Sequence, residues 1–440
     1  MIGRSFAAAC LVLATGGALR ADDTAALLRQ IDAGTIAAIS DGDFVGATYA
    51  TGRLNPGTDE DVLTVLGRDG DRVSIGHVAV SNSVTSPPEA IALARDGRTA
   101  FVVERLGARR PGIDTARALP AGRRLHAIDL ADKARPRIAA TAELAAYPES
   151  VRVSPDGSLV AVVSNSEEAS VLQLIPYRAG KFGAVTSVPL AAHGIAGSGH
   201  GPRGGVTASF ADWHPSGRYL AVNVYTQNRV VFFELQQDGA GLDVRRWGNI
   251  VETGKDPFVG RFTPDGAYYL TADWGRDFTA TTLEGRLPPR RSSISVIRLG
   301  EGPDPEHRRL GGVETDESSE GLAVSPDGRL VATVNMRTTA FSPDSARFAR
   351  EATVTLLTFD PARGALEKVA DYPFTGVLPE GATFDLSGNT LLVTVFQEHG
   401  GKPAGGGIDV WRVVKQEQPR LERAGRIVVP HGVHHVEVAR

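Results

Sequence analysis

One sequence motif recurs about seven times along this chain and limits what the chain can fold into. Each copy has an opening that is often Pro-Glu, an apolar strand, a turn on Asp-Gly or Ser-Gly, and a second apolar strand, as in PESVRVSPDGSLVAVV from Pro148. Further copies start at Pro88, Ala208, Pro257, Ser319 and Pro379, and a more divergent one, TIAAISDGDFVGATYA, starts at Thr35. Self-similarity at a period of roughly 50 to 60 residues, with several short strands in each unit, is typical of a β-propeller.

Each unit is long enough for four antiparallel strands. In the unit that starts at Pro148 we expect them at Val151 to Ser154, Leu159 to Val163, Ser170 to Ile175 and Val185 to Leu190. These segments are rich in β-branched residues, and Asp-Gly turns suit the hairpins between them because Gly takes positive φ without steric cost. We therefore predict an all-β fold, a seven-bladed β-propeller with four-stranded antiparallel blades.

The two ends of the chain predict how the ring closes. PHGVHHVEVAR, from Pro430 to Arg440, matches the opening and first strand of a unit and stops where the turn should come. Near the other end, Phe44 to Tyr49, Asp61 to Val65 and Val73 to Val80 are consistent with second to fourth strands. We expect the C-terminal strand to join this N-terminal blade, because this removes the exposed edges of an open ring. In the alternative, Thr35 to Ile39 supplies the first strand and the C-terminal segment pairs elsewhere.

The first 21 residues have the pattern of a secretory signal peptide: Arg4, an apolar stretch from Phe6 to Gly17, and small residues up to Ala21. The apolar stretch is too short to span a bilayer, and no later one is long enough. Cys10, the only cysteine, lies inside this leader, so the mature protein would have no disulfide. The sequence therefore predicts a periplasmic or secreted protein without membrane insertion.

Residues 22–440 are expected to form one propeller domain, because radial repeats share faces with their neighbours and grow without splitting. No Pro- or Ser-rich linker divides this region. The formal net charge of -4 argues against general nucleic-acid binding, which requires a basic surface. We expect a monomer whose partner is a small polar molecule or a protein.

The connections of a propeller blade lie on two opposite faces. Turns between the first and second and between the third and fourth strands lie on one, here called the turn face. Loops between the second and third strands, and crossovers to the next blade, lie on the other, called the loop-rich face. The insertions Arg105 to Arg124, Gly275 to Arg291 and Arg337 to Glu351 are second-to-third loops, and Ala191 to Val206 is a crossover. Because long loops on a rigid scaffold commonly carry binding residues, we expect the functional site on the loop-rich face.

Aligning the units places one residue of each at the start of its innermost strand, around the mouth of the central channel. These ring residues are Glu89, Glu149, Ser209, Phe258, Glu320, Glu380 and His431. Three positions later the alignment gives Ala92, Arg152, Asp212, Arg261, Ala323, Thr383 and His434. Carboxylates near arginines and a histidine can hold a cation, bind a polar ligand, or raise one another's pKa so that one serves as a base. In the structural alternative, they accept backbone N–H groups and hold water.

Other motifs with known chemistry are missing from the sequence. There is no Gly-rich phosphate loop after a strand, no HExxH, no haem CxxCH and no GxSxG. His434 and His435 are adjacent on a strand and point to opposite faces, so they cannot chelate one metal together. Arginines near Arg109 can bind phosphate or carboxylate, although exposed arginines are more often solvated surface. We expect no cofactor and no metal.

The repeats VSPDGSLVAVVSN, HPSGRYLAVNVYTQNRVVFFEL and VSPDGRLVATVN resemble those of YVTN-type propellers and of the seven-bladed lactonase family, which includes 6-phosphogluconolactonase and muconate-lactonising relatives. The resemblance covers nearly the whole chain after the leader. Gly197 to Arg203 (GSGHGPR) resembles the Gly-Ser-Gly-Pro segment that precedes the same blade in lactonases. The family's Pro-His-x-His is replaced here by Gly204 to Ser209, and its Pro-Arg-His by Pro257, Phe258 and Val259. The resemblance therefore implies the fold and a lactonase-type hydrolase, and it assigns no catalytic residue.

Three functions follow from these observations. The first is a propeller that binds a small polar ligand or a partner protein, with binding candidates Glu89, Glu149, Asp212, Glu320, Glu380, His431, His200 and Arg203. The second is a lactone hydrolase in which Glu149 or Glu380 is the base and Arg152, Arg261 or His434 stabilises the oxyanion. The third, an accessory subunit of a redox enzyme, rests on fold analogy. An enzyme needs its carboxylate and cation within a few ångströms of each other in a concave pocket, whereas a binding surface does not.

Overall fold

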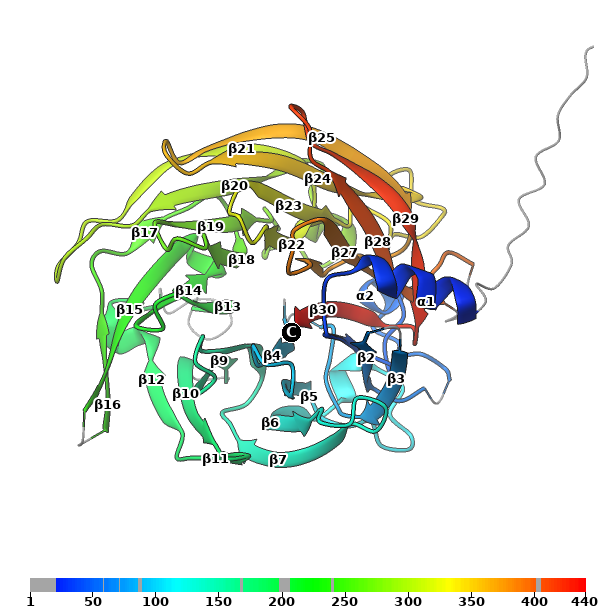
Figure 1. Ribbon diagram of the computed structural model, residues 1–440, viewed down its shortest axis with the longest axis horizontal. Helices are drawn as coiled ribbons and strands as arrows, with labels where there is room; N and C mark the ends of the chain where they lie inside the picture. Colours follow the sequence, from blue (N-terminus) through cyan, green and yellow to red (C-terminus); the bar gives the residue numbers. More distant parts are fainter. Residues whose placement is uncertain are drawn as a thin grey trace, which may run out of the picture.

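The computed structural model is a ring of β-sheets around a central axis (Figure 1). It describes residues 21–57, 59–70, 72–85, 89–166, 169–197, 206–238, 241–400 and 405–440. In this part of the chain the strands form seven sheets, and each sheet runs outward from an innermost strand. The predicted seven-bladed all-β propeller is therefore confirmed.

The blades are described from the innermost strand outward. Blade 1 holds β30 (Val433–Ala439), β1 (Thr35–Ser40), β2 (Val62–Asp69) and β3 (Arg72–Ala79); blade 2 holds β4 (Ile91–Leu93), β5 (Thr99–Leu106), β6 (Ala121–Asp129) and β7 (Arg137–Glu143). Blade 3 holds β8 (Pro148–Val153), β9 (Leu159–Asn165) and β10 (Ser170–Arg178), with β11 (Lys181–Phe182) and β12 (Thr186–Pro189) both pairing β10. Blade 4 holds β13 (Phe210–Trp213), β14 (Tyr219–Val224) and β15 (Arg229–Asp238), with β16 (Gly241–Arg246) and β17 (Val251–Glu252) both pairing β15.

The last three blades are regular four-stranded sheets. Blade 5 holds β18 (Pro257–Phe262), β19 (Tyr268–Asp273), β20 (Arg291–Arg298) and β21 (Arg308–Glu317); blade 6 holds β22 (Ser319–Val324), β23 (Leu330–Asn335), β24 (Glu351–Asp360) and β25 (Ala365–Thr375); blade 7 holds β26 (Ala382–Phe384), β27 (Thr390–Val395), β28 (Gly406–Val414) and β29 (Arg420–Val429). In the part of the chain that the structure describes, the helices are α1 (Ala21–Gln30), α2 (Thr48–Thr51) and α3 (Leu283–Arg286), with short 3-10 turns at Ala116–Ala118, Leu190–His193 and Tyr225–Gln227. No helix among the described residues is both long and apolar enough to cross a membrane.

The repeated Asp-Gly turn makes the hairpins of the turn face tight. In blade 3, Gly157 has φ 75°, and its N–H donates to the Ser154 carbonyl at 2.8 Å. The Asp156 carboxylate accepts the Ser158 N–H at 3.1 Å, which fixes the turn from inside. The turn between the first and second strands is therefore structural, as its sequence predicts.

The ring closes as the sequence predicts. Strand β30 is the innermost strand of blade 1 and pairs antiparallel with β1, with Thr35 opposite Ala439 and Ala37 opposite Glu437. In Figure 1 the red β30 lies beside the axis and joins the blue N-terminal blade. Each end of the described chain thus supplies part of the same sheet, so no innermost edge is left open.

The predicted strand from Phe44 to Tyr49 is wrong. The second strand of blade 1 is β1, so the SDG sequence after it is not a hairpin turn. One oxygen of Asp41 accepts the N–H groups of Asp43 and Phe44, which turns the chain away from the sheet, and α2 follows. Residues 41–61 are consequently a long second-to-third loop.

Apolar side chains fill the spaces between neighbouring blades. Phe101 of blade 2 packs with Val151 and Val160 of blade 3 in one such buried cluster. Helix α1 lies across blade 7, where the side chain of Leu27 fills the space over Gly425 of β29. These contacts form a rigid scaffold on which the loops are mounted.

Candidate functional site

Four long loops lie on the loop-rich face. Residues 41–61, 107–120, 274–290 and 336–350 connect the second and third strands of blades 1, 2, 5 and 6. The last three confirm the predicted insertions, and the first was hidden by the wrong strand assignment. The crossover between β12 and β13 includes His200 and Arg203, which lie outside the described residues.

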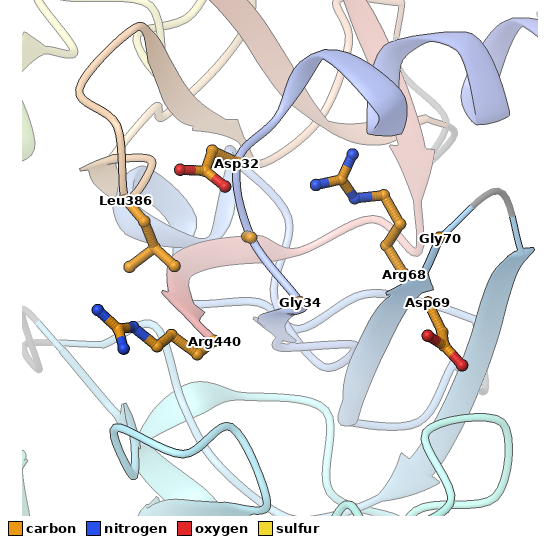
Figure 2. Close-up of a pocket in the computed structure, with 8 residues that line it drawn as sticks. Asp32, Gly34, Arg68, Asp69, Gly70, Leu386 and Arg440 are labelled. Carbon is orange, nitrogen blue, oxygen red and sulfur yellow. The ribbon is translucent and has the colours of Figure 1, made fainter.

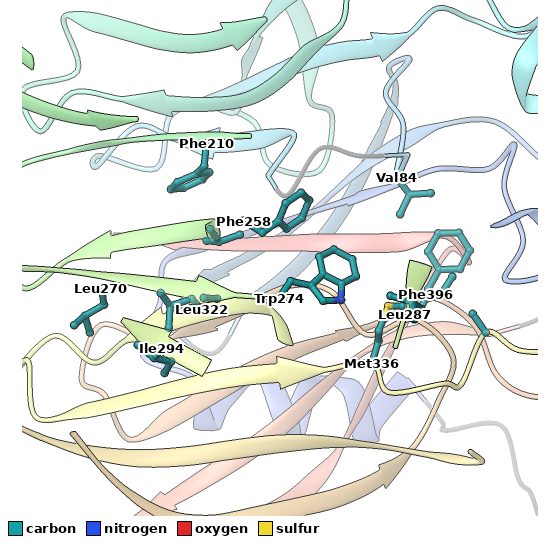
Figure 3. Close-up of a cluster of buried hydrophobic side chains, with 14 of the residues drawn as sticks. Val84, Phe210, Phe258, Leu270, Trp274, Leu287, Ile294, Leu322, Met336 and Phe396 are labelled. Atoms are coloured by element: carbon teal, nitrogen blue, oxygen red, sulfur yellow. The ribbon is translucent and has the colours of Figure 1, made fainter. Parts of the chain in front are cut away.

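Apolar side chains from these loops gather in one buried cluster (Figure 3). It contains Trp274, Leu287 and Met336 from the loops, Val84 from a crossover, and Phe258 from β18. The four ring glutamates are also buried, with Glu89 3%, Glu149 1%, Glu320 4% and Glu380 3% exposed. The channel mouth is therefore not an open ring of solvated carboxylates.

Two of the ring glutamates sit in β-bulges. The register of β8 against β9 shifts between Pro148 and Ser150, at Glu149, and that of β22 shifts in the same way at Glu320. A bulge re-aims the side chain of its extra residue. Glu149 meets Arg105 of the preceding blade, with 3.3 Å between Oε1 and the guanidinium Nε.

Glu320 and Glu380 form an electrostatically coupled pair beside Tyr49. Burial raises the pKa of Glu320 to about 8, although the nearby Arg276 opposes this shift. Burial and the charge of Glu320 raise the pKa of Glu380 well above its usual value. The Tyr49 hydroxyl lies 3.4 Å from Glu380 Oε1. At neutral pH the pair therefore holds at least one proton and can both donate and accept hydrogen bonds.

Several buried polar atoms at these positions have no hydrogen-bond partner among the described residues. They are both carboxylate oxygens of Glu149, Nε and Nη1 of Arg105, and one oxygen each of Glu320 and Glu380. Buried polar atoms are nearly always paired in folded proteins. Such atoms on both pairs of ring residues, Arg105 with Glu149 and Glu320 with Glu380, consequently indicate places for water or a ligand.

A second group of charged side chains spans the central channel. Arg152 binds Glu89 at 3.2 Å, Asp212 at 3.2 Å, and Glu437. Arg261 also binds Glu89. These residues belong to blades 1 to 5, so the contacts cross the axis of the ring. The structure thus brings together four of the predicted site residues, Glu89, Arg152, Asp212 and Arg261.

Mutual neutralisation holds this channel network together. Although burial alone would raise it, Arg152 and His435 lower the pKa of Glu437 to about 2. Burial opposes the charged form of Arg152, but Glu437, Asp212 and Glu89 together raise its pKa. Because the donors of Arg152 already serve three carboxylates, this guanidinium has little capacity left for an oxyanion.

Two of the three predicted histidines, His431 and His434, lie apart from the network. His434 Nε2 is 2.9 Å from Asn82 Oδ1, and burial lowers the pKa of His434 to about 3, with a smaller effect from His435. His431 lies 3.4 Å from Asn55 Nδ2 and 3.8 Å from Asp59. Neither histidine contacts Arg152, so the structure does not gather all the residues that the alignment proposed.

Among the residues that the structure describes, two groups have the composition of a metal site. In the first, Glu89, His435 and Glu437 place one ligand atom each within 4.8 Å of the others, but both carboxylates already bind Arg152. The second is Asp41, Asp43 and Asp61 in loop 41–61. Their oxygens accept hydrogen bonds from backbone N–H groups or face Arg109. Such contacts stabilise the conformation of the loop.

Two of the cavities formed by the described residues lie away from the axis. One, of about 510 Å³, is on the turn face between α1 and the end of β30 and includes Asp32, Arg68 and Arg440 (Figure 2). The other, of about 720 Å³, lies between the loops 41–61 and 107–120 of blades 1 and 2. Only the second is on the loop-rich face, where the insertions are.

Comparison with solved structures identifies the architecture. The chain is similar to the periplasmic gluconolactonase of Pseudomonas aeruginosa, with a TM-score of 0.64 and 19% identity over 92% of this chain and 99% of that one. The fold is that of the lactonase-like propellers. Two 6-phosphogluconolactonase candidates give the same result: one from Bacteroides uniformis (TM-score 0.62, 15% identity, 92% and 99% coverage) and one from Bacteroides fragilis (TM-score 0.62, 13% identity, 92% and 98% coverage).

These similarities concern the lactonase-like fold and not the reaction. No protein-family model matches the sequence, and no curated protein matches it. The resemblance read from the repeats is confirmed as far as the seven-bladed architecture is concerned. The chemistry must therefore be argued from the residues of this chain.

Sequence reasoning missed three residues that the structure places at the candidate sites. Arg105 was included only as the first residue of a loop, and it is the partner of Glu149. His435 and Glu437 face the channel because the register of β30 shifts at His434, between the pairs Ile39–His435 and Ser40–Val433. The i, i+2 spacing of His435 and Glu437 was the available signal, since both side chains then share one face of the strand.

Proposed function

We propose that this protein is an exported lactonase-like propeller that binds a small, hydroxyl-rich molecule at the ring residues beneath the loop-rich face. The observation that carries the proposal is the set of buried polar atoms on Glu149, Arg105, Glu320 and Glu380 that have no hydrogen-bond partner among the described residues, although Arg105 and Glu149 form an ion pair. Leaving a buried donor or acceptor unpaired costs about 1 to 3 kcal/mol for each group. A ligand that pairs them recovers this free energy as affinity.

The chemistry of the unpaired atoms defines the ligand class. Carboxylate oxygens accept hydrogen bonds from hydroxyl groups, and the Arg105 guanidinium donates to a carbonyl, carboxylate or ring oxygen. A sugar lactone or the corresponding sugar acid offers both kinds of group in one small molecule. The name of the Pseudomonas neighbour, a gluconolactonase, supports the same class.

The burial of these side chains has a kinetic consequence. The ring glutamates lie under loops that pack through Val84, Trp274 and Met336, so a ligand reaches them only when these loops move. We therefore expect association to be slower than at an open, preformed site, because binding requires a conformational change.

Thermal unfolding with glucono-δ-lactone, gluconate and glucose as probes tests the proposal. At least one probe should raise the melting temperature, because a ligand that binds only the folded form stabilises it. Glu149→Gln should abolish or strongly reduce this shift. Glu284→Gln, in the exposed first turn of α3, is the matched control and should preserve it. A protein whose melting temperature none of the three probes changes would contradict this ligand class.

Lactone hydrolysis is a second candidate function, and the Glu320–Glu380 pair favours it. One ionised carboxylate would take a proton from water as the water oxygen attacks the lactone carbonyl. The protonated partner would then give its proton to the ring oxygen as the ring C–O bond breaks, as in other carboxyl pairs that share a proton. Arg152 and Arg261 are less suited to the oxyanion than the sequence suggested, since both bind carboxylates.

The hydrolysis of glucono-δ-lactone, followed with a pH indicator, separates the two functions. An enzyme should lose at least about 100-fold in kcat with Glu320→Gln or Glu380→Gln, which removes acid–base capacity. Ligand binding without catalysis predicts that lactone disappears at the rate seen with no protein present. Equal rates for both variants and the unaltered protein would rule out the carboxyl pair as the catalyst.

Export is part of the proposal and is tested separately. The leader pattern of residues 1–21 predicts cleavage after Ala21. Expression of the full chain in a bacterium should give a periplasmic protein that begins at Asp22 when its N-terminus is sequenced. A cytoplasmic protein that retains Met1 would contradict this part.

A further inference from the structure

The cavity between blades 1 and 2 has rigid walls. Loops 41–61 and 107–120 are joined by backbone hydrogen bonds, Leu54 N–H to the Asp114 carbonyl at 3.0 Å and Ala116 N–H to the Gly52 carbonyl at 2.9 Å. Arg109 adds a third link, because its Nη1 donates to the Asn55 carbonyl at 2.7 Å. The space of about 720 Å³ that they enclose is therefore a feature of the fold. Its size is that of a typical small-molecule site.

The charged lining of this cavity is mainly acidic. Its carboxylates are Asp43, Asp59, Glu60, Asp61 and Glu104. Its arginines are Arg109, Arg110 and Arg124. His126 adds no charge at neutral pH, since burial, with a smaller effect from Arg124, lowers its pKa to about 4. The five carboxylates and three arginines leave an excess of at most two negative charges, because burial and the charge of Asp41 raise the pKa of Asp61 well above its usual value.

Arg109, which the sequence suggested for anion binding, already has partners within the protein. Nη1 of Arg109 lies 3.7 Å from Asp43, and Nε donates to the Ile113 carbonyl at 2.8 Å. Arg124 lies 4.0 Å from Glu104. An anionic ligand would thus meet the excess of carboxylates, so the charge balance favours a cation.

Glu104 is the carboxylate best placed to take that cation. It is buried on β5, and burial raises its pKa, with opposing effects from the Arg123 N–H and Arg124. Its Oε2 accepts the Arg123 N–H at 3.3 Å, while Oε1 accepts no hydrogen bond from the described residues. A partly desolvated carboxylate that has an oxygen without a hydrogen-bond partner gains more from a cation than a solvated carboxylate does.

The rest of the lining is apolar and selects an organic cation over a hydrated ion. Pro56, Val80, Pro111, Ile113 and Ile138 line the cavity. A metal ion has no apolar surface to bury against these side chains, whereas the hydrocarbon part of an organic cation does. We propose that this cavity binds a small organic amine, with the ammonium group at Glu104 and the hydrocarbon body against these apolar side chains.

A matched pair of probes tests the proposal by isothermal titration calorimetry. Cyclohexylmethylamine should bind, and cyclohexylmethanol, which has the same body without the charge, should bind at least about tenfold more weakly. Equal affinities for the two, or tighter binding of cyclohexylacetate, would overturn the proposal. A heat of binding with Ca²⁺ but not with the amine would also overturn it, because it would assign the acidic lining to a metal.

Variants place the amine at the cavity. Glu104→Gln keeps an oxygen for the Arg123 N–H and removes the charge, so amine affinity should fall at least about fivefold while the alcohol is unaffected. Glu314→Gln, on an exposed position of β21, is the control and should change neither affinity. Glu149→Gln at the ring should leave amine binding intact, which keeps this test independent of the proposed function. Unchanged amine affinity in Glu104→Gln would contradict the assignment.

Discussion

Arg105 and Glu149 come from neighbouring blades and meet inside the protein, with Arg105 Nε 3.3 Å from Glu149 Oε1 and side chains that are 10% and 1% exposed. The guanidinium also lies over the Tyr147 ring, 4.5 Å from its centroid. Each charge is therefore the main compensation for the other in a region from which water is largely excluded.

Arg105→Met should destabilise the protein by about 3 to 5 kcal/mol, since it leaves Glu149 charged, buried and alone. The double variant with Glu149→Leu should recover much of this loss because no isolated charge remains. Arg53→Met, which breaks an ion pair whose side chains are 70% and 64% exposed, is the control and should cost at most about 1 kcal/mol. Urea unfolding measures all three. If the double variant is as unstable as the sum of the losses in Arg105→Met and in Glu149→Leu alone, the two charges do not compensate each other.

Arg152→Met should be strongly destabilising at pH 7 and much less so at low pH. In the unaltered protein, Arg152 and His435 outweigh burial and hold the pKa of Glu437 near 2, below its usual 4.5. The stability that this provides is present above pH 4.5 and is lost as the pH falls towards 2. The difference in unfolding free energy between variant and unaltered protein should therefore shrink across this window. Arg412→Met, at an exposed ion pair, should show a small and flat difference.

The Glu320→Gln variant should gain stability relative to the unaltered protein as the pH rises from 5 to 8. Burial raises the pKa of Glu320 to about 8, so between pH 4.5 and 8 the folded form holds a proton that the unfolded form releases. The contribution of Glu320 to the free energy of unfolding of the unaltered protein thus falls as the pH rises, by at most about 1.4 kcal/mol per pH unit. Glutamine does not titrate, so the variant's advantage should grow with pH. A constant difference across this range would mean that Glu320 has no raised pKa.

Gly432→Ala should prevent folding or cost several kcal/mol, whereas Gly157→Ala should cost about 1 to 2. Both glycines have positive φ, 85° and 75°. A Cβ on Gly432 would lie 1.9 Å from the Asp41 carbonyl oxygen, while one on Gly157 would meet nothing within 4 Å. Urea unfolding of the two variants separates backbone strain from steric overlap. Similar losses would imply that the Gly432 loop can move away from Asp41.

Deletion of residues 433–440 should give an insoluble protein or one less stable by about 5 kcal/mol or more, because several hydrogen bonds and buried side chains are lost together. The truncation leaves the backbone of β1 unpaired on its axial side. Soluble yield and melting temperature measure the effect. A truncated protein that melts within a degree or two of the full chain would contradict the role of β30 in closure.

The parts of the structure that repeat were readable from the sequence. PHG at Pro430 aligns with PES at Pro148, so β30 was identified as a first strand and the closure followed from it. The same alignment brought Glu89, Arg152 and Asp212 to one channel, where they do meet. Aligning the repeats predicts these contacts because equivalent positions in each blade lie at equivalent places around the axis.

Features that depend on the pairing between strands could not be predicted from the sequence. The bulge at Glu149 turns it toward Arg105, and the register shift at His434 lets His435 face the channel instead. Both depend on where a neighbouring strand places its hydrogen bonds, and no residue type at these positions requires a bulge. The apolar cluster around Trp274 likewise joins loops from several blades, so no single repeat contains it.

The pairing of β1 with β30 has a consequence for synthesis. Strand β1 is among the first parts of the propeller to leave the ribosome, and its axial neighbour follows only after the other six blades. Until then its inner edge exposes N–H and C=O groups that any extended segment can pair with. A nascent or stalled chain would thus be open to mispairing for the whole of its elongation, and joining ends so distant in sequence makes completion of the ring a slow folding step. A chaperone that shields the edge of β1 during this interval would raise the yield of native protein without touching the finished fold.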